Sequence, residues 1–271
     1  MRREIRERDL FGDVSGIGGE DLRTARRQQR LSESAAIVLT GRDFEVLKFI
    51  SEMKFASSTE IFEKFFKITR DQKEAASESW TKKRLLQLER AGFLKSTYTF
   101  SESTRYFVVT FRSYYALKNY YPHEEIPKPL LTIDIRTFVH DRALLTLRLR
   151  LEREEAACGW ISDRVLRSGL DRSFGFSSKY VPDGLYEKVC GDKVAVELEI
   201  AQKTKQRYRG KVAFYVSLLR SEASKLSGLK QVRFICLKKP CFEAIKKETR
   251  MFGSLFQVEL EVSTADEGDL A

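Results

Sequence analysis

Three acidic side chains in the second half of the chain have the types and spacing that could hold a divalent cation. The segment KVAVELEI (193–200) alternates as a β-strand, so that Ala195, Glu197 and Glu199 share one face. Two carboxylates on one face of an otherwise apolar strand are costly unless they are solvated or neutralised. If Asp183 ends the neighbouring strand, three acids converge, and Mg²⁺ or Mn²⁺ is the natural neutraliser. A cation held there could activate water at a phosphate ester.

Basic side chains follow this acidic strand. We expect a helix over 203–220, in which Lys203, Arg207 and Lys211 recur at i, i+4 and i+8 and line one side. A basic ridge beside an acidic pocket suits a phosphodiester substrate. The alternative is an exposed edge strand whose glutamates pair with that same ridge.

The elements that must position these residues follow an α/β order. A long helical pattern covers 133–157, and strand patterns cover 160–166, 180–186, 193–200, 232–237 and 255–262. Helices are expected over 203–220 and 241–253. This order predicts an α/β domain with a mixed central sheet over residues 133–263.

The first half reads as three helices followed by a hairpin. Helical spacing begins near Thr40 and continues in 57–66 and 80–92, where Gly92 suits the position after a helix end. Alternating segments at 93–100 and 104–111 predict the hairpin, and 113–121 a closing helix. This is the winged-helix arrangement, in which the third helix enters the major groove of DNA. We therefore predict a winged helix-turn-helix domain over 38–121.

Polar side chains of the third helix and the hairpin form the expected DNA-contacting surface. The polar face of the helix is basic, and we expect it to have no acidic partner until Glu89, which favours contact with DNA over a solvated face used for protein interaction. The predicted DNA-binding residues of the whole chain are Lys82, Lys83, Arg84, Gln87, Arg90, Arg105, Arg207 and Lys211.

Charge and composition agree with a polyanionic partner. The 271 residues carry 49 Lys and Arg against 39 Asp and Glu, a net charge of +10. The remaining segments are a basic flexible arm (1–37), a proline-containing linker (122–132) and an acidic tail (264–271). No signal peptide or membrane span is evident, and the four cysteines form no CxxC pair. We expect a cytoplasmic protein with reduced, mostly buried thiols.

The order of these motifs resembles known proteins. PDG followed by ELE at a strand end resembles the PD-(D/E)xK, restriction-endonuclease-like superfamily. Helical sequence of the type LTGRDFEVLKFI and RLLQLERAGFL, then a His-Asp helix and PDG…ELE, resembles the replication-relaxation family of plasmid and mobile-element proteins over about residues 38–220.

The resemblance implies a role for each matching residue. Asp183 and Glu197 would be the metal-binding acids, and Glu199 stands where the superfamily usually has its catalytic lysine. Lys203 or Lys205 would supply that lysine from the next helix. The His140–Asp141 pair would add an acid from the first helix of the domain.

The sequence thus predicts a protein of plasmid or mobile-element replication or DNA processing that binds double-stranded DNA. Its catalytic residues would be Asp183, Glu197, Glu199 and Lys203, forming an endodeoxyribonuclease site that depends on Mg²⁺ or Mn²⁺. The alternative is a non-catalytic replication or transcription regulator whose nuclease-like domain mediates contacts or dimerisation. A module for RNA processing or protein interaction is a third reading, and a homodimer stays open.

Overall fold

The computed structural model describes residues 37–68, 77–99, 102–168 and 174–261. The chain divides into two compact units, Met1–Val38 and Leu39–Ala271, of which the second is treated below. The predicted basic arm, except for residue 37, and the acidic tail lie outside the described residues. The predicted boundaries at residues 121 and 132 stay predictions.

In its described residues, the first half of the larger unit contains four helices and a three-stranded antiparallel sheet with the strand order β1-β3-β2. The helices are α2 (Gly41–Met53), α3 (Ser58–Phe65), α4 (Ser79–Arg90) and α5 (Phe111–Tyr120), and the strands are β1 (Ala56–Ser57), β2 (Leu94–Thr99) and β3 (Glu102–Val109).

Local sequence signals explain where these helices begin and end. Thr40 and Ser57 each form a reciprocal capping box, with Asp43 and Glu60 respectively, at the starts of α2 and α3. Gly92 follows α4 with φ +75°, a left-handed conformation that glycine adopts without strain. The predicted order of three helices and a hairpin is therefore present.

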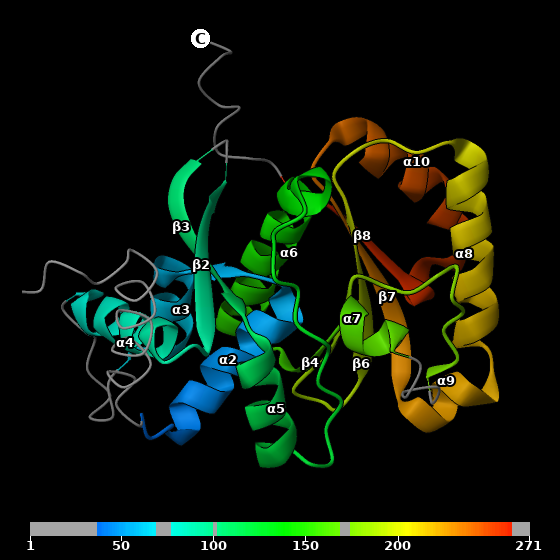
Figure 1. The fold of residues 1–271 in the computed structure, drawn as a ribbon. Coiled ribbons are helices and arrows are strands. Elements are labelled where there is room, and N and C mark those ends of the chain that lie inside the picture. The colour runs from blue at the N-terminus through cyan, green and yellow to red at the C-terminus, as the bar shows by residue number, and fades with distance from the viewer. Residues whose placement is uncertain (1–36, 69–76, 100–101, 169–173, 262–271) are drawn as a thin grey trace, which may run out of the picture. The chain divides into compact units, whose positions relative to one another are not determined.

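The second half is built on a five-stranded sheet (Figure 1). Its strands are β4 (Cys158–Ser162), β5 (Gly184–Glu187), β6 (Lys193–Glu199), β7 (Leu229–Cys236) and β8 (Phe256–Leu260). Its helices are α6 (Ile135–Glu154), α7 (Asp163–Arg167), α8 (Lys205–Leu219), α9 (Glu222–Ser227), α10 (Lys239–Thr249) and the 3₁₀ helix η3 (Arg250–Leu255).

The sheet is mixed, as predicted. Its order is β4-β5-β6-β7-β8, with antiparallel pairing from β4 to β6 and parallel pairing from β6 to β8. The strand that carries the two glutamates is therefore central, so the alternative is wrong about an edge strand but right that these glutamates pair with Lys203 and Lys211. Helices α8 and α10 cover one face, where Tyr208, Val212 and Tyr215 pack against Ala195 and Phe234 (Figure 1).

Several expectations about the second half needed correction. The strand predicted over 160–166 ends at Ser162 and gives way to α7, and the helix predicted over 241–253 continues beyond Thr249 only as the 3₁₀ helix η3. The short elements β1 and α9 were not predicted. All four cysteines are free, but only Cys236 and Cys241 are buried. The expectation of buried thiols is wrong for the exposed Cys158 and Cys190.

Candidate functional site

The pairing of β5 with β6 brings the three predicted acids together. Asp183 lies one residue before β5, and its backbone N–H donates to the carbonyl of Val196 at 2.9 Å. Its carboxylate Oδ2 accepts the backbone N–H of Leu198 at 2.8 Å. Glu197 and Glu199 are buried on the α8 side of β6. Asp183 is the most solvent-exposed of the three acids. Its side chain is 20% exposed, whereas those of Glu197 and Glu199 are 4% and 1% exposed.

Lys211 holds the two glutamates from α8. Its Nζ lies 2.7 Å from Glu197 Oε2 and 3.0 Å from Glu199 Oε1. The hydroxyl of Tyr215, one turn further along α8, donates to Glu197 Oε1 at 2.5 Å. Lys203 Nζ lies 2.6 Å from Glu199 Oε2. Each of the four glutamate oxygens therefore faces a donor or cation from this chain.

The His-Asp pair of α6 reaches the site from its other side. His140 Nε2 lies 3.4 Å from Asp183 Oδ2, and its Nδ1 lies 3.5 Å from Asp141 Oδ1. Asp141 also receives Lys54 Nζ at 2.6 Å and the Thr137 hydroxyl at 2.8 Å. A polar chain thus runs from Lys54, at the end of α2, to the carboxylate of Asp183.

These contacts perturb the pKa values of the cluster. Burial alone would lower the pKa of His140, but its hydrogen bonds to Asp141 and Asp183 raise that pKa to about 10, so the imidazole is a cation at neutral pH. Burial would raise the pKa of Asp183, but the hydrogen bond and charge of His140 hold that pKa below its ordinary value. Burial raises the pKa of Glu197 even though Lys211 acts in the opposite direction.

One acid of this region was missed at the sequence level. The carboxyl of Asp163, at the start of α7, is partly buried, with 18% of its side chain exposed, and burial raises its pKa. The charge of Asp183 acts in the same direction, and that of Lys54 opposes it. The backbone N–H of Asp163 donates to the carbonyl of Asp183 at 3.2 Å. Asp163 is therefore an additional proton-binding group beside the cluster, and only the pairing of β4 with β5 reveals it.

A pocket of about 440 Å³ opens above the acids. Asp183, Glu197 and Lys211 line it, and so do further side chains that are mostly basic or polar: Arg167, Lys179, Tyr180, Val181, Lys203, Thr204, Gln206 and Arg207. Arg167, Lys179 and Tyr180 were not predicted, because they come from segments that only the fold brings next to α8. The five basic residues of the pocket outnumber its two acids.

The predicted basic ridge is only partly present. Lys203 precedes α8, which begins at Lys205, and Arg207 is exposed as expected. Lys211 is buried, with 11% of its side chain exposed, because it turns toward Glu197 and Glu199. The prediction that Lys211 lies on the basic surface is wrong for this reason.

Several basic side chains of the predicted DNA-contacting surface form ion pairs with acidic side chains of this chain. Arg84 makes two bonds to the buried Asp43, at 2.9 and 2.6 Å, and a third to Gln87 at 3.1 Å. Two more of the predicted residues have acidic partners: Lys82 pairs with Glu78 at 3.0 Å, and Arg105 with Glu89 at 2.5 Å. The expectation that the helix face lacks acidic partners before Glu89 is therefore wrong.

Three of the predicted cations on α4 are exposed, namely Lys82, Lys83 and Arg90, and of these Lys82 pairs with Glu78. The side chain of Lys83 lies over the ring of Trp80, which is 75% exposed, and Arg90 is exposed at the end of the helix. These two side chains are available to a partner on this surface.

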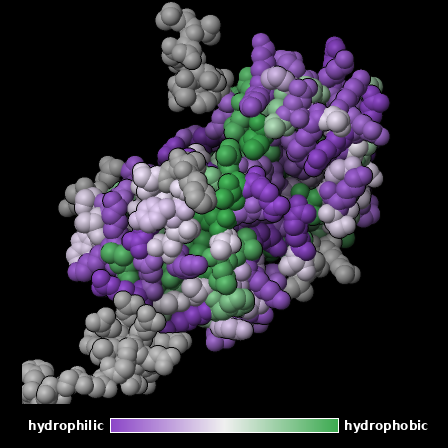
Figure 2. Space-filling model, turned by 45° about the horizontal axis from the view of Figure 1, so that its top comes forward, coloured by the Kyte–Doolittle hydropathy of each residue, from purple (hydrophilic) through white to green (hydrophobic). Residues whose placement is uncertain are grey.

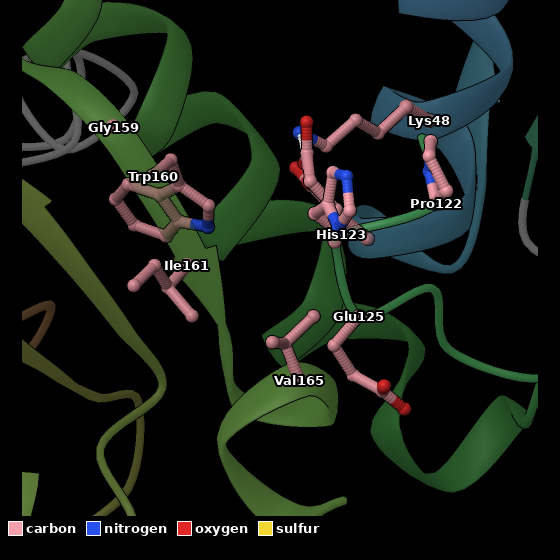
Figure 3. A pocket seen from close by; sticks show the side chains of 10 residues that line it. Lys48, Pro122, His123, Glu125, Gly159, Trp160, Ile161 and Val165 are labelled. Carbon is pink, nitrogen blue, oxygen red and sulfur yellow. Dashed lines mark hydrogen bonds and ion pairs between the residues drawn. The ribbon is translucent and has the colours of Figure 1, made fainter. Parts of the chain in front are cut away.

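A larger cleft, of about 550 Å³, lies on the other side of β4 (Figure 3). Trp160, Ile161 and Val165 form one wall, and Lys48 and the segment 122–125 form the other. The benzo ring of Trp160 packs on Gly184, the residue that follows Asp183. This cleft contains none of the predicted catalytic residues, so its greater size does not make it the better candidate site.

The remaining observations are negative within the part of the chain that the structure describes. No group of three or more His, Cys, Asp or Glu side chains is arranged there to hold a metal ion. No helix in those residues is both long and apolar enough to cross a lipid bilayer. No protein-family model, curated protein or solved structure matches the chain. The fold and the side-chain geometry therefore carry the functional argument.

Proposed function

We propose that this chain binds double-stranded DNA, with the basic pocket above Asp183 taking a phosphate of the backbone. The observation that carries the proposal is the excess of cations around that pocket. Lys179 and Arg207 lie on its lining together with Arg167 and Lys203, which also pair with Asp163 and Glu199. The four cations come from the end of α7, the segment before β5 and the start of α8. Clustered lysines and arginines bind a phosphate backbone by charge and by release of counterions.

The first half of the unit supports the same partner. Its three helices and hairpin follow the order of a winged helix, in which the third helix lies in the major groove. Lys83 and Arg90 are exposed on that helix. Hydrophilic side chains dominate the face drawn in Figure 2, although a hydrophobic band crosses its middle.

The proposal is tested by fluorescence anisotropy with a labelled duplex of about 30 base pairs, long enough to cover an interface of this class. Lys83→Ala and Arg207→Ala should each weaken binding several-fold. Lys225→Ala removes the same charge from an exposed pair with Glu222, outside the pocket and α4, and should leave the affinity unchanged. Equal affinities for wild type, Lys83→Ala and Arg207→Ala would remove both surfaces from the interface.

A metal-dependent nuclease is the second candidate, favoured by the opening of Asp183 into the pocket. Carboxylates with nearby phosphate oxygens are the ligand set that Mg²⁺ prefers. However, Lys211 already lies against both glutamates, so the side chains as placed do not fit a cation shared by Asp183 and Glu197. Nicking of supercoiled plasmid in Mg²⁺ or Mn²⁺ that is lost in Asp183→Ala would establish cleavage. Plasmid left intact by the wild-type protein in both metals would exclude it.

Our proposal for the biological process is based on the family resemblance of the sequence. The order of helices, His-Asp pair and PDG…ELE segment supports a role in plasmid or mobile-element replication or in DNA relaxation. A regulator without catalytic activity fits the same geometry, because the pocket can bind a phosphate without cleaving it.

A further inference from the structure

Lys211 stands where the chemistry of the site would otherwise call for a metal ion. Its ammonium group lies within 3.0 Å of one oxygen from each of Glu197 and Glu199. The charge of Asp183 also acts on it, and the charge of Lys211 acts on Asp183 in return. The ammonium group of Lys211 therefore contacts two of the three acids that the sequence singles out, and Lys211 lines the same pocket as the third.

The chain supplies enough positive charge to balance these acids. Lys203 pairs with Glu199 and His140 pairs with Asp183, while Lys211 pairs with both glutamates. Three carboxylates thus face three cations. A divalent ion added to this arrangement would leave an excess of positive charge in a buried site, which is costly.

The position of Lys211 makes an exchange feasible. Its side chain forms part of the pocket lining, and a lysine has a long, flexible stem that can carry its ammonium group into solvent. Removal of the ammonium group would leave Glu197 and Glu199 as adjacent buried acids without the cation that they share.

We infer that Lys211 is the resident cation of this acidic cluster and that it competes with divalent metal ions for the carboxylates. The wild-type site therefore binds Mn²⁺ or Mg²⁺ weakly and stays assembled in chelator. Replacing Lys211 by an uncharged side chain converts the cluster into a metal site. This inference concerns the acids beneath the pocket and needs no DNA, so it stands or falls separately from the proposed function.

The test compares Mn²⁺ binding by the wild-type chain and by Lys211→Met, which keeps a similar length without the charge. Binding is followed by the electron paramagnetic resonance of free Mn²⁺ and by thermal unfolding in MnCl₂ and in EDTA. We expect Lys211→Met to bind Mn²⁺ at least about tenfold more tightly than wild type and to gain about 5 °C or more in Tm with the metal. The wild-type Tm should be the same in both solutions.

Control variants test whether the gain in Mn²⁺ binding arises at the acidic cluster, and a second Lys211 variant is used if Lys211→Met does not fold. Lys225→Met removes an exposed lysine that pairs with Glu222 outside the cluster, and this variant should behave as wild type. Glu197→Gln added to Lys211→Met should abolish the gain in binding. If Lys211→Met does not fold in EDTA, folding on addition of MnCl₂ supports the inference, and Lys211→Gln repeats the comparison. Equal Mn²⁺ affinity in wild type and both Lys211 variants would overturn the inference, as would a gain that persists after Glu197→Gln.

Discussion

The residue after Asp183 must be a glycine, because the Trp160 ring of the neighbouring strand leaves no space for a Cβ atom at position 184. A Cβ atom built on Gly184 would lie 2.2 Å from Trp160 Cζ2, with two more ring atoms at 2.7 and 2.8 Å. Ordinary contacts of this kind need about 3.5 Å, so the ring or β5 would have to move by about 1 Å in a closely packed interior. We expect Gly184→Ala to lower the free energy of unfolding by about 1–3 kcal/mol, the range for overpacking.

Denaturant unfolding measures this effect, and the chain offers a convenient probe. It has two tryptophans, so a Trp80→Phe background leaves Trp160 as the reporter of the packed ring. Gly253→Ala is the matched control, because a Cβ there meets no atom within 4 Å, and its effect should stay within about 0.5 kcal/mol.

Removal of the clash should restore part of the lost stability. Trp160→Phe shortens the ring system that meets Gly184, although it leaves a space of its own. The cost of the double variant should fall below the sum of the single costs by about 1 kcal/mol or more. That comparison uses far-UV circular dichroism, since the reporter ring is gone. The packing argument is refuted if Gly184→Ala matches wild type or if the two substitutions are additive.

Three further predictions follow from other buried contacts. The pKa of His140 should be about 10 by imidazole NMR and should fall in Asp183→Asn. Its stabilising contribution is present below pH 6.5 and is lost as the pH rises through about 10, because the folded-state pKa is raised. Arg233→Met should cost about 1–3 kcal/mol in denaturant unfolding, since it leaves the partly exposed carboxylates of Glu155 and Glu259 without their shared partner. Lys83→Ala should weaken DNA binding without loss of stability, whereas Arg84→Ala should cost about 1–3 kcal/mol in the same unfolding assay by stranding a buried carboxylate.

Each of these predictions has an outcome that contradicts it. A His140 pKa near 6.5 would mean that the contacts with Asp183 and Asp141 do not persist in solution. An Arg233→Met variant as stable as wild type would show that its network contributes no net stability. Equal stability of Arg84→Ala and Lys83→Ala would argue against the bond to Asp43.

Local patterns in the sequence predicted most of the elements. Thr40 and Ser57 carry their capping signals within three residues, and Gly92 marks a helix end by its own conformational freedom. Alternation placed Glu197 and Glu199 on one face of a strand, which is where the structure has them. These features are local, so a sequence is sufficient to find them.

The partners of these residues were harder to foresee, because they depend on contacts between distant segments. Helical spacing placed Lys211 on the basic face of α8, but the attraction of two buried glutamates draws its side chain inward. Arg84 likewise finds Asp43, 41 positions away in the chain. A run of basic residues therefore predicts an exposed basic surface only where the fold places no buried carboxylate close enough to bind their side chains.

The salt dependence of DNA binding tests the central claim most directly. The affinity for a labelled duplex is measured across a range of salt concentrations for wild type and for Lys83→Ala/Arg207→Ala. Our account predicts a linear fall of log affinity with log salt for wild type. It predicts a slope smaller by about 2 for the double variant, one for each lost phosphate contact. A wild-type affinity that ignores salt, or a double variant with the wild-type slope, would contradict it.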